Sequence, residues 1–109
     1  MVNQWDIYLA NLNPVQWHEQ SWFRPVLIIQ NNILNKNLNT VVVAPITSNT
    51  KAKWKMTTYF LWQISWLQKD SIALLFQIRT IDKSRLTSKI WSIDKDEFLL
   101  IKKQLMFVF

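Results

Sequence analysis

The polar side chains that could do chemistry lie at or beside the ends of predicted strands. They form three groups along the chain: Glu19, Gln20 and Arg24; Thr47 and Ser48; and Gln77, Arg79 and Asp82. Binding and catalytic residues are commonly mounted on loops and strand ends of a rigid scaffold. If the strands close into a barrel, the loop that carries the first group faces the corner that carries the second.

Each group also has a structural interpretation, which the residues alone leave open. Arg24 directly precedes an apolar Pro-Val-Leu segment and could pair with Glu19 or Asp6. The hydroxyls of the Thr47–Ser48 pair could simply cap backbone N–H groups at the start of a loop. The Arg79–Asp82 pair could be an internal ion pair. Residue type and position therefore mark a candidate site but do not assign its chemistry.

Several classes of function are disfavoured by what the sequence lacks. It has no Gly-rich phosphate loop, no HExxH and no CxxC motif. A single His and the absence of Cys argue against a metal site, so we expect no metal ion and no cofactor. The net charge of +6 and the pI of about 9.9 favour a polyanionic partner, either nucleic acid or an acidic protein. The basic loop of Lys51, Lys53 and Lys55 is either a solvated face or a phosphate-attracting one.

The chain of 109 residues is expected to form a single domain, 1–109, with one core. Its longest apolar runs are too short to cross a bilayer. The first residues show no signal-peptide pattern. The absence of Cys agrees with a reducing compartment, so we expect a cytoplasmic protein.

Five or six short strands must position the candidate groups. Apolar, β-branched or alternating patterns predict strands over 5–12, 24–31, 40–47, 56–61 and 71–81. The first alternates as a half-buried strand does, and Pro45 interrupts the third. One short helical turn is expected within the Asn-rich segment 31–39 and another within 82–90, which then leads into a short strand.

A C-terminal helix follows the strands. Asp94 and Glu97 form a capping-box pattern at its start. Apolar residues then recur at helical spacing: Phe98, Ile101, Leu105 and Phe109. Strands followed by one helix predict a mainly β fold, a small and strongly curved β-barrel or sandwich with the C-terminal helix packed on it.

The most unusual feature of the composition is the presence of seven Trp and no Gly. Average usage predicts roughly eight Gly in a chain of this length. Glycine is the usual residue where the backbone needs a positive φ, and a bulky residue there is rare. Either the protein uses unusual turns, or some of its Trp positions are glycine in the source organism.

Three separated motifs resemble the MazF/PemK toxins of bacterial toxin–antitoxin systems. They are WDIYLANLNPVQWHEQSWFRPVLIIQN, VVVAPITS and DSIALLFQIRTIDKSRL, in the family's order and covering most of the chain. Only residues 48–62 and the C-terminal tail match loosely. The resemblance implies an SH3-like β-barrel homodimer that cuts single-stranded RNA. It also implies a cognate acidic antitoxin whose extended tail occupies the RNA groove.

The resemblance further implies roles for individual residues. Cleavage would need no metal, because the RNA 2′-OH is the nucleophile and leaves a 2′,3′-cyclic phosphate and a 5′-OH. Arg24 would stabilise the charge on the phosphorane oxygens, since a guanidinium is always charged and donates in a fork. Thr47 would donate to the scissile phosphate, and Glu19 would orient Arg24. The RNA groove would be lined by Gln20, Ser48, Gln77 and Arg79.

The chain departs from the family pattern at two kinds of position. Phe76 replaces an acidic residue that usually precedes the Gln of the third motif. Trp stands at four family glycines: Trp5, Trp17, Trp22 and Trp66. We therefore hypothesise that UGA encodes glycine in the source organism and is translated here as Trp, an idea that seven UGG codons would refute. For the chain as written we expect reduced stability, because Trp does not readily adopt a positive φ.

Two other functions remain open at this point. Related toxins of the same fold poison a topoisomerase by protein contact, so the chain could be a non-catalytic protein-binding barrel. It could also be a plain RNA-binding barrel without activity. The presence of both Arg24 and Thr47 favours the nuclease.

Overall fold

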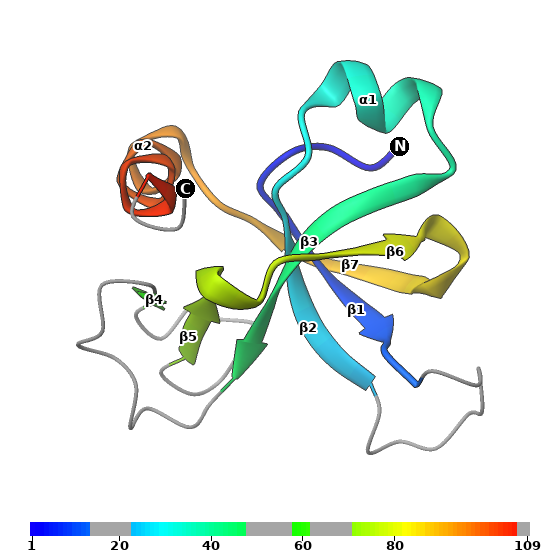
Figure 1. Ribbon diagram of the computed structural model, residues 1–109, viewed down its shortest axis with the longest axis horizontal. Coiled ribbons are helices and arrows are strands. Elements are labelled where there is room, and N and C mark those ends of the chain that lie inside the picture. The colour runs from blue at the N-terminus through cyan, green and yellow to red at the C-terminus, as the bar shows by residue number, and fades with distance from the viewer. Residues whose placement is uncertain (14–22, 48–57, 62–70, 107–109) are drawn as a thin grey trace.

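A computed structural model describes residues 1–13, 23–47, 58–61 and 71–106 of the chain (Figure 1). In chain order, its elements are β1 (Asp6–Asn11), β2 (Phe23–Ile28), α1 (Asn32–Asn37), β3 (Thr40–Thr47), β4 (Thr58–Leu61), β5 (Ser71–Leu74), the 3₁₀ turn η3 (Leu75–Gln77), β6 (Arg79–Asp82), the 3₁₀ turn η4 (Lys83–Arg85), β7 (Leu86–Ser92) and α2 (Lys95–Leu105). None of the helices in these ranges is both long and apolar enough to cross a membrane.

The strands form one antiparallel, seven-stranded sheet in the order β4-β5-β3-β2-β1-β7, with β6 also paired to β3. Figure 1 shows the strands fanning out from a common crossing, with α1 above it and α2 to its upper left. Within the described residues, β6 and β7 share no ladder, although η4 joins them directly. The prediction of a mainly β fold with a C-terminal helix is confirmed.

Both faces of the sheet are covered by apolar residues. On one face, residues from β1, β2, β3 and β5 pack with α2, and the members of this cluster include Ile7, Leu27 and Ile101. On the other face, Ala10, Val26 and other residues pack inside the curve of the sheet. The prediction of a half-buried first strand is therefore wrong, because β1 places apolar side chains in both clusters.

Strand β3 runs without interruption through Pro45, contrary to the prediction. Pro45 pairs with Val26 of β2, and on its other side it lies between two separate ladders. One ladder ends at Val43 with β6, and the other begins at Ile46 with β5. Proline has no N–H to donate to a ladder, so the gap between two neighbours is a position where it is tolerated.

The single strand predicted over 71–81 is in fact two strands, β5 and β6, separated by η3. Ala73 pairs with Ile46 and Arg79 with Val43, so six steps on one segment face three on β3. The turn η3 takes up the excess, and its first residue, Leu75, is fully buried. The segment contains no Gly, Pro or Asn that would mark a turn, so the sequence gave no sign of this step.

The predicted helical turns are present. Asn31 caps α1, so β2 ends at Ile28 and not at residue 31. The turn η4 lies within 82–90 as expected. The Asp94 side chain accepts a 2.9 Å hydrogen bond from the Glu97 N–H at the start of α2, as its N-cap position predicts. Ile101 and Leu105 are buried while Lys102 is exposed, which confirms the predicted apolar stripe up to residue 105.

Trp5 has a positive φ of 75°, the one such value among the described residues. Its N–H donates to Ile28 O at 2.8 Å, and its carbonyl accepts from Ile93 N at 2.9 Å, so the backbone is held on both sides. The expectation that a Trp here would occupy a glycine-like conformation is confirmed at this position. Trp17, Trp22 and Trp66 lie outside the described residues.

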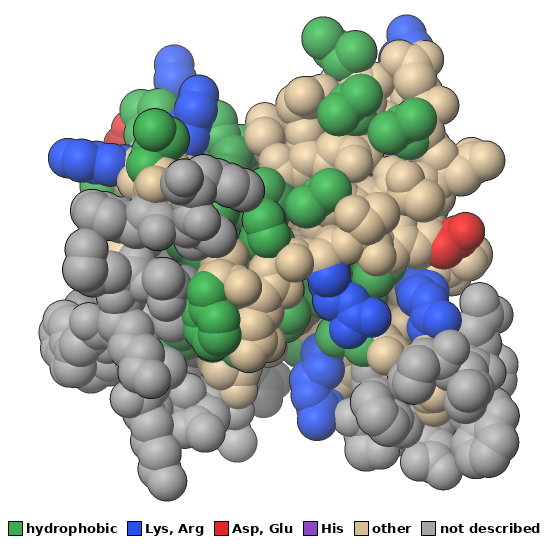
Figure 2. Space-filling model, viewed as in Figure 1, with side chains coloured by type: hydrophobic (Ala, Val, Ile, Leu, Met, Phe, Trp, Pro, Cys, Tyr) green, Lys and Arg blue, Asp and Glu red, His purple; other side chains and the backbone are tan. Residues whose placement is uncertain are grey.

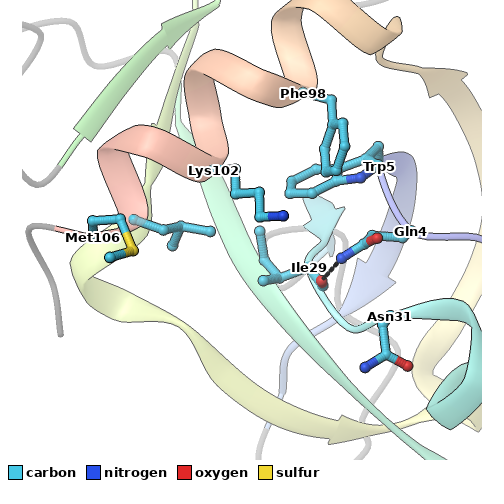
Figure 3. Close-up of a pocket in the computed structure, with 8 residues that line it drawn as sticks. Gln4, Trp5, Ile29, Asn31, Phe98, Lys102 and Met106 are labelled. Carbon is cyan, nitrogen blue, oxygen red and sulfur yellow. Dashed lines mark hydrogen bonds between the residues drawn. The ribbon is translucent and has the colours of Figure 1, made fainter.

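The Trp5 indole is buried between β1 and α2, with 8% of the residue exposed. Its ring centroid lies 4.0 Å from that of Phe98, with the planes tilted by 55° (Figure 3). Beside the two rings is a pocket of about 370 Å³, whose lining also includes Ile29, Lys102 and Met106. The pocket is therefore formed partly by the residue whose identity the sequence puts in question.

Candidate functional site

Arg24 lies at the loop end of the β1–β2 hairpin, directly opposite Ala10. It is exposed, and its Nη1 donates to the carbonyl of Phe23 at 3.1 Å. Along β2, Arg24 shares a sheet face with Val26 and Ile28, both of which are buried in the cluster inside the curve. The buried apolar residues thus hold β2 in the core, and the Arg24 guanidinium is exposed at the end of the strand.

The alternative pairing of Arg24 with Asp6 is excluded. The Asp6 carboxylate is buried, lies 3.4 Å from Lys89 Nζ and accepts a 2.6 Å hydrogen bond from the Ser92 hydroxyl. Burial, and then the negative charge of Asp6, raises the pKa of Tyr8, while Lys89 acts to lower it. Asp6 therefore holds β1 to β7 and is not a partner of the candidate site.

Thr47 is the last residue of β3, and the register brings it to the same edge as Arg24. Val26 pairs with Pro45, and the next residues on the same face are Arg24 on β2 and Thr47 on β3. The ladder between β2 and β3 ends at the Val26–Pro45 pair, and Figure 1 shows the two strands diverging beyond it. The Arg24 guanidinium and the Thr47 hydroxyl therefore come from neighbouring strands at the same edge.

Gln77 and Arg79 come from η3 and the start of β6. Arg79 and Gln77 are both exposed, and Arg79 pairs with Val43. Phe76 precedes them with 46% of the residue exposed, while its neighbour Leu75 is fully buried and fixes the turn. The third motif therefore delivers an amide, a cation and an exposed ring beside the same part of β3.

The alternative ion pair between Arg79 and Asp82 is not formed. The Asp82 carboxylate instead accepts a 2.9 Å hydrogen bond from Ser84 N and caps η4. Hydrogen bonds from the Ser84 backbone and side chain, with a smaller effect of Arg85, lower the pKa of Asp82. Asp82 is a local cap, and Arg79 remains available to a ligand.

Positive side chains gather at this edge of the molecule. In Figure 2, Lys and Arg side chains cluster on the lower central part of the visible face, where β1, β2 and β6 lie. Arg24, Arg79 and Arg85 belong to these elements or to η4 beside them. Such a concentration of positive charge attracts phosphate oxygens.

Three predicted site residues, Glu19, Gln20 and Ser48, lie outside the described residues, as does the basic loop of residues 51–55. Their roles stay predictions. Among the predicted site residues that are described, Arg24 and Thr47 lie at one edge. Gln77 in η3 and Arg79 in β6 lie beside strand β3.

One residue with a clear structural link to this edge was missed by the sequence reasoning. Arg85 ends η4, and its Nη1 donates to the carbonyl of Asn11 at 3.0 Å and also to that of Asn13. The available signal was its place as the next-to-last residue of the third motif, three positions after Asp82. Nothing in the sequence showed which part of the chain it contacts.

Comparison with known proteins adds a family to this geometry. A family model described as "PemK-like, MazF-like toxin of type II toxin-antitoxin system" matches residues 3–109. An "Endoribonuclease MazF" of Staphylococcus epidermidis is 42% identical over 106 residues, which cover 96% of this chain and 88% of that protein.

Solved structures show the same fold. The Mycobacterium tuberculosis toxin MazF-mt6 superposes with a TM-score of 0.78 at 22% identity, over 94% of each chain. A MazE-MazF structure from Deinococcus radiodurans gives a TM-score of 0.77 at 20% identity, over 98% of this chain and 94% of that one.

Proposed function

We propose that this chain is an RNA-cutting toxin, because it belongs to the family of PemK-like, MazF-like toxins of type II toxin–antitoxin systems. It is a homologue, over nearly its whole length, of a protein named as an endoribonuclease. The observation that carries the proposal for this chain is the register of β2 and β3, which puts Arg24 and Thr47 on one face at one edge. The substrate is single-stranded RNA.

The reaction proceeds by internal attack. The 2′-oxygen loses its proton and bonds to the adjacent phosphorus, while the bond from phosphorus to the 5′-oxygen breaks and that oxygen gains a proton. The products are a 2′,3′-cyclic phosphate and a 5′-OH, and no metal takes part. Charge grows on the phosphorane oxygens during the step, so groups aimed at those oxygens stabilise the transition state more than the ground state.

Arg24 is the residue best suited to that charge. Its guanidinium is exposed and donates to a neutral carbonyl in the described structure, so it can turn to a phosphate without breaking an ion pair with Asp6. Thr47 donates its hydroxyl hydrogen to the same phosphate, and Glu19 orients Arg24. Gln20, Ser48, Gln77 and Arg79 bind the RNA on either side, and Phe76 offers a ring to one base.

The remaining features of the proposal come from the family. The curved sheet is the SH3-like barrel, the active form is a homodimer, and the protein acts in the cytoplasm. An acidic antitoxin neutralises it by covering the basic edge. The presence of an antitoxin partner is supported by a protein of the same fold, a mycobacterial endoribonuclease solved in complex with its cognate antitoxin. Charge complementarity with the net charge of +6 agrees with such a partner.

The test is cleavage of a single-stranded RNA in excess EDTA. Wild type should cut and leave cyclic phosphate ends. Arg24→Ala and Thr47→Ala should each lower the rate by about 100-fold or more, as expected for loss of one transition-state donor. Thr47→Ser keeps the hydroxyl and should retain most activity. Lys102→Ala, an exposed cation on α2 at the opposite end of the β1–β2 hairpin, is the control and should not change the rate.

The same experiment separates the nuclease from its alternatives. A folded wild type that binds RNA without cutting it would favour the non-catalytic RNA-binding barrel. A folded wild type that neither binds nor cuts RNA would favour the protein-binding toxin. Either outcome would overturn the proposed function.

A further inference from the structure

Arg85 makes a two-point contact with the end of β1. One guanidinium nitrogen donates to the carbonyls of both Asn11 and Asn13. These two residues are buried, with 7% and 2% exposed, and Asn13 N also donates to Asn11 Oδ1 at 3.0 Å. The guanidinium is planar and always charged. Its two hydrogen bonds from one nitrogen therefore hold the carbonyls of Asn11 and Asn13 at fixed positions relative to each other.

This contact lies next to the strand position of Arg24 in the candidate site. On the neighbouring strand, Asn11 pairs with Phe23 and Ala10 with Arg24. Ala10 also pairs with Leu86, the residue after Arg85, so Leu86, Ala10 and Arg24 form one row across three strands.

We propose that Arg85 is a positioning residue for RNA cleavage: it fixes the end of β1 and thereby the strand position of Arg24. The inference rests on the proposed function. Arg85 itself does not touch the scissile phosphate. A displacement of about 1 Å in a catalytic group can lower a rate about 100-fold, which is the scale of effect that a lost anchor can have.

The same 3₁₀ turn supplies a matched control. Lys83 donates through Nζ to the carbonyl of Asn35, in α1, so it also ties η4 to a backbone carbonyl. Its acceptor is not part of the β1–β2 hairpin. Replacing Lys83 therefore removes a comparable charge and a comparable contact without releasing Asn11 or Asn13.

The experiment compares Arg85→Met, Arg85→Lys and Lys83→Met in the full chain. Three quantities are measured: kcat and KM on single-stranded RNA in EDTA, the exchange rate of the Asn13 amide, and the free energy of unfolding. Arg85→Met should lower kcat by about 10- to 100-fold with KM within about twofold of wild type. Its Asn13 amide should exchange about tenfold faster or more, because local opening becomes easier. Lys83→Met should leave kcat and the Asn13 exchange rate unchanged.

Arg85→Lys decides the matter if Arg85→Met fails to fold. A lysine ammonium is a compact charge without the planar fork, so it should keep the charge but restore the anchor only in part. Added guanidinium ion at low millimolar concentration should raise kcat of either variant but not that of wild type or Lys83→Met.

Several results would overturn the proposal. Unchanged kcat with faster Asn13 exchange would make Arg85 a purely structural residue. A raised KM at unchanged kcat would mean that Arg85 binds RNA directly. If wild type does not cut RNA, the proposed function fails, and the Asn13 exchange rates still decide independently whether Arg85 fixes the end of β1.

Discussion

Replacing Trp5 with glycine sets two opposing contributions to stability against each other. The indole is buried against Phe98, with 8% of Trp5 exposed and ring centroids 4.0 Å apart. Removing such a side chain costs about 3–5 kcal/mol. The backbone at φ 75° is strained for any residue with a Cβ, and glycine relieves about 1–2 kcal/mol of that strain.

The informative comparison is therefore between Trp5→Gly and Trp5→Ala. Both variants lose the indole, but alanine keeps the strain. Relative to alanine, glycine lowers the free energy of unfolding by about 0.4–1 kcal/mol, because it makes the unfolded chain more flexible. The strain term exceeds this, so we expect Trp5→Gly to be more stable than Trp5→Ala by about 1 kcal/mol, with both below wild type.

The assay is equilibrium unfolding in urea, with free energies compared at matched m-values. Trp91 provides the control, since it lies in β7 and is not among the described residues with positive φ. There the order should reverse, with Trp91→Ala more stable than Trp91→Gly by about 0.5–1 kcal/mol, because glycine weakens a strand interior.

A Trp5→Ala variant at least as stable as Trp5→Gly would refute the reasoning. It would mean that the positive φ is not a property of the native backbone, or that the loop adjusts without cost. A loss well below about 1.5 kcal/mol in Trp5→Gly, the smallest that these contributions allow together, would indicate that α2 moves in to close the space left by the indole.

Three further predictions follow from the sequence and the site. In the RNA assay, Phe76→Ala should raise KM by about 5- to 100-fold if the exposed ring stacks on a base, whereas Phe76→Tyr should stay near wild type. The pKa of Asp82 is lowered in the folded state, so its contribution to stability is present above the unfolded pKa near 3.9 and is lost as pH falls through the folded value. The melting temperatures of wild type and Asp82→Asn should accordingly converge below about pH 4, and a constant difference down to pH 2 would contradict this. In the source organism, the gene should carry UGA at the Trp positions and the purified protein should have the mass of a glycine-containing chain; UGG codons would end the idea.

Features governed by local patterns could be predicted from the sequence. The strands β1, β2 and β3, the cap at Asp94 and the stripe on α2 follow from side-chain periodicity and from one hydrogen-bonding side chain. Arg24 and Thr47 were placed at strand ends for the same reason. Their meeting at one edge depends on the register of β2 with β3, which the pairing of Val26 with Pro45 shows. From the sequence it could be expected only on the condition that the strands close into a barrel.

Features governed by long-range pairing could not be predicted. The step at η3 exists because β3 has different neighbours on either side of Pro45, and no residue within 71–81 encodes that. The Arg85 contact joins residues more than seventy positions apart through backbone carbonyls, which have no sequence signature. From charge and nearness in sequence, Asp6 was a possible partner of Arg24, and Asp82 a possible partner of Arg79. In the structure, the buried Asp6 pairs with Lys89, and Asp82 caps η4 instead of pairing with Arg79.

Strand β3 pairs with β2, β5 and β6, and this has a consequence for the chain during its synthesis. When β3 has just emerged from the ribosome, β5 and β6 have not yet been released, so of its three partner strands only β2 is available. The ladder with β6 needs residues up to Asp82, and the row that contains Arg24 is complete only when Leu86 has emerged. Translation must therefore pass most of the chain before the edge that carries Arg24 and Thr47 has all its strand partners.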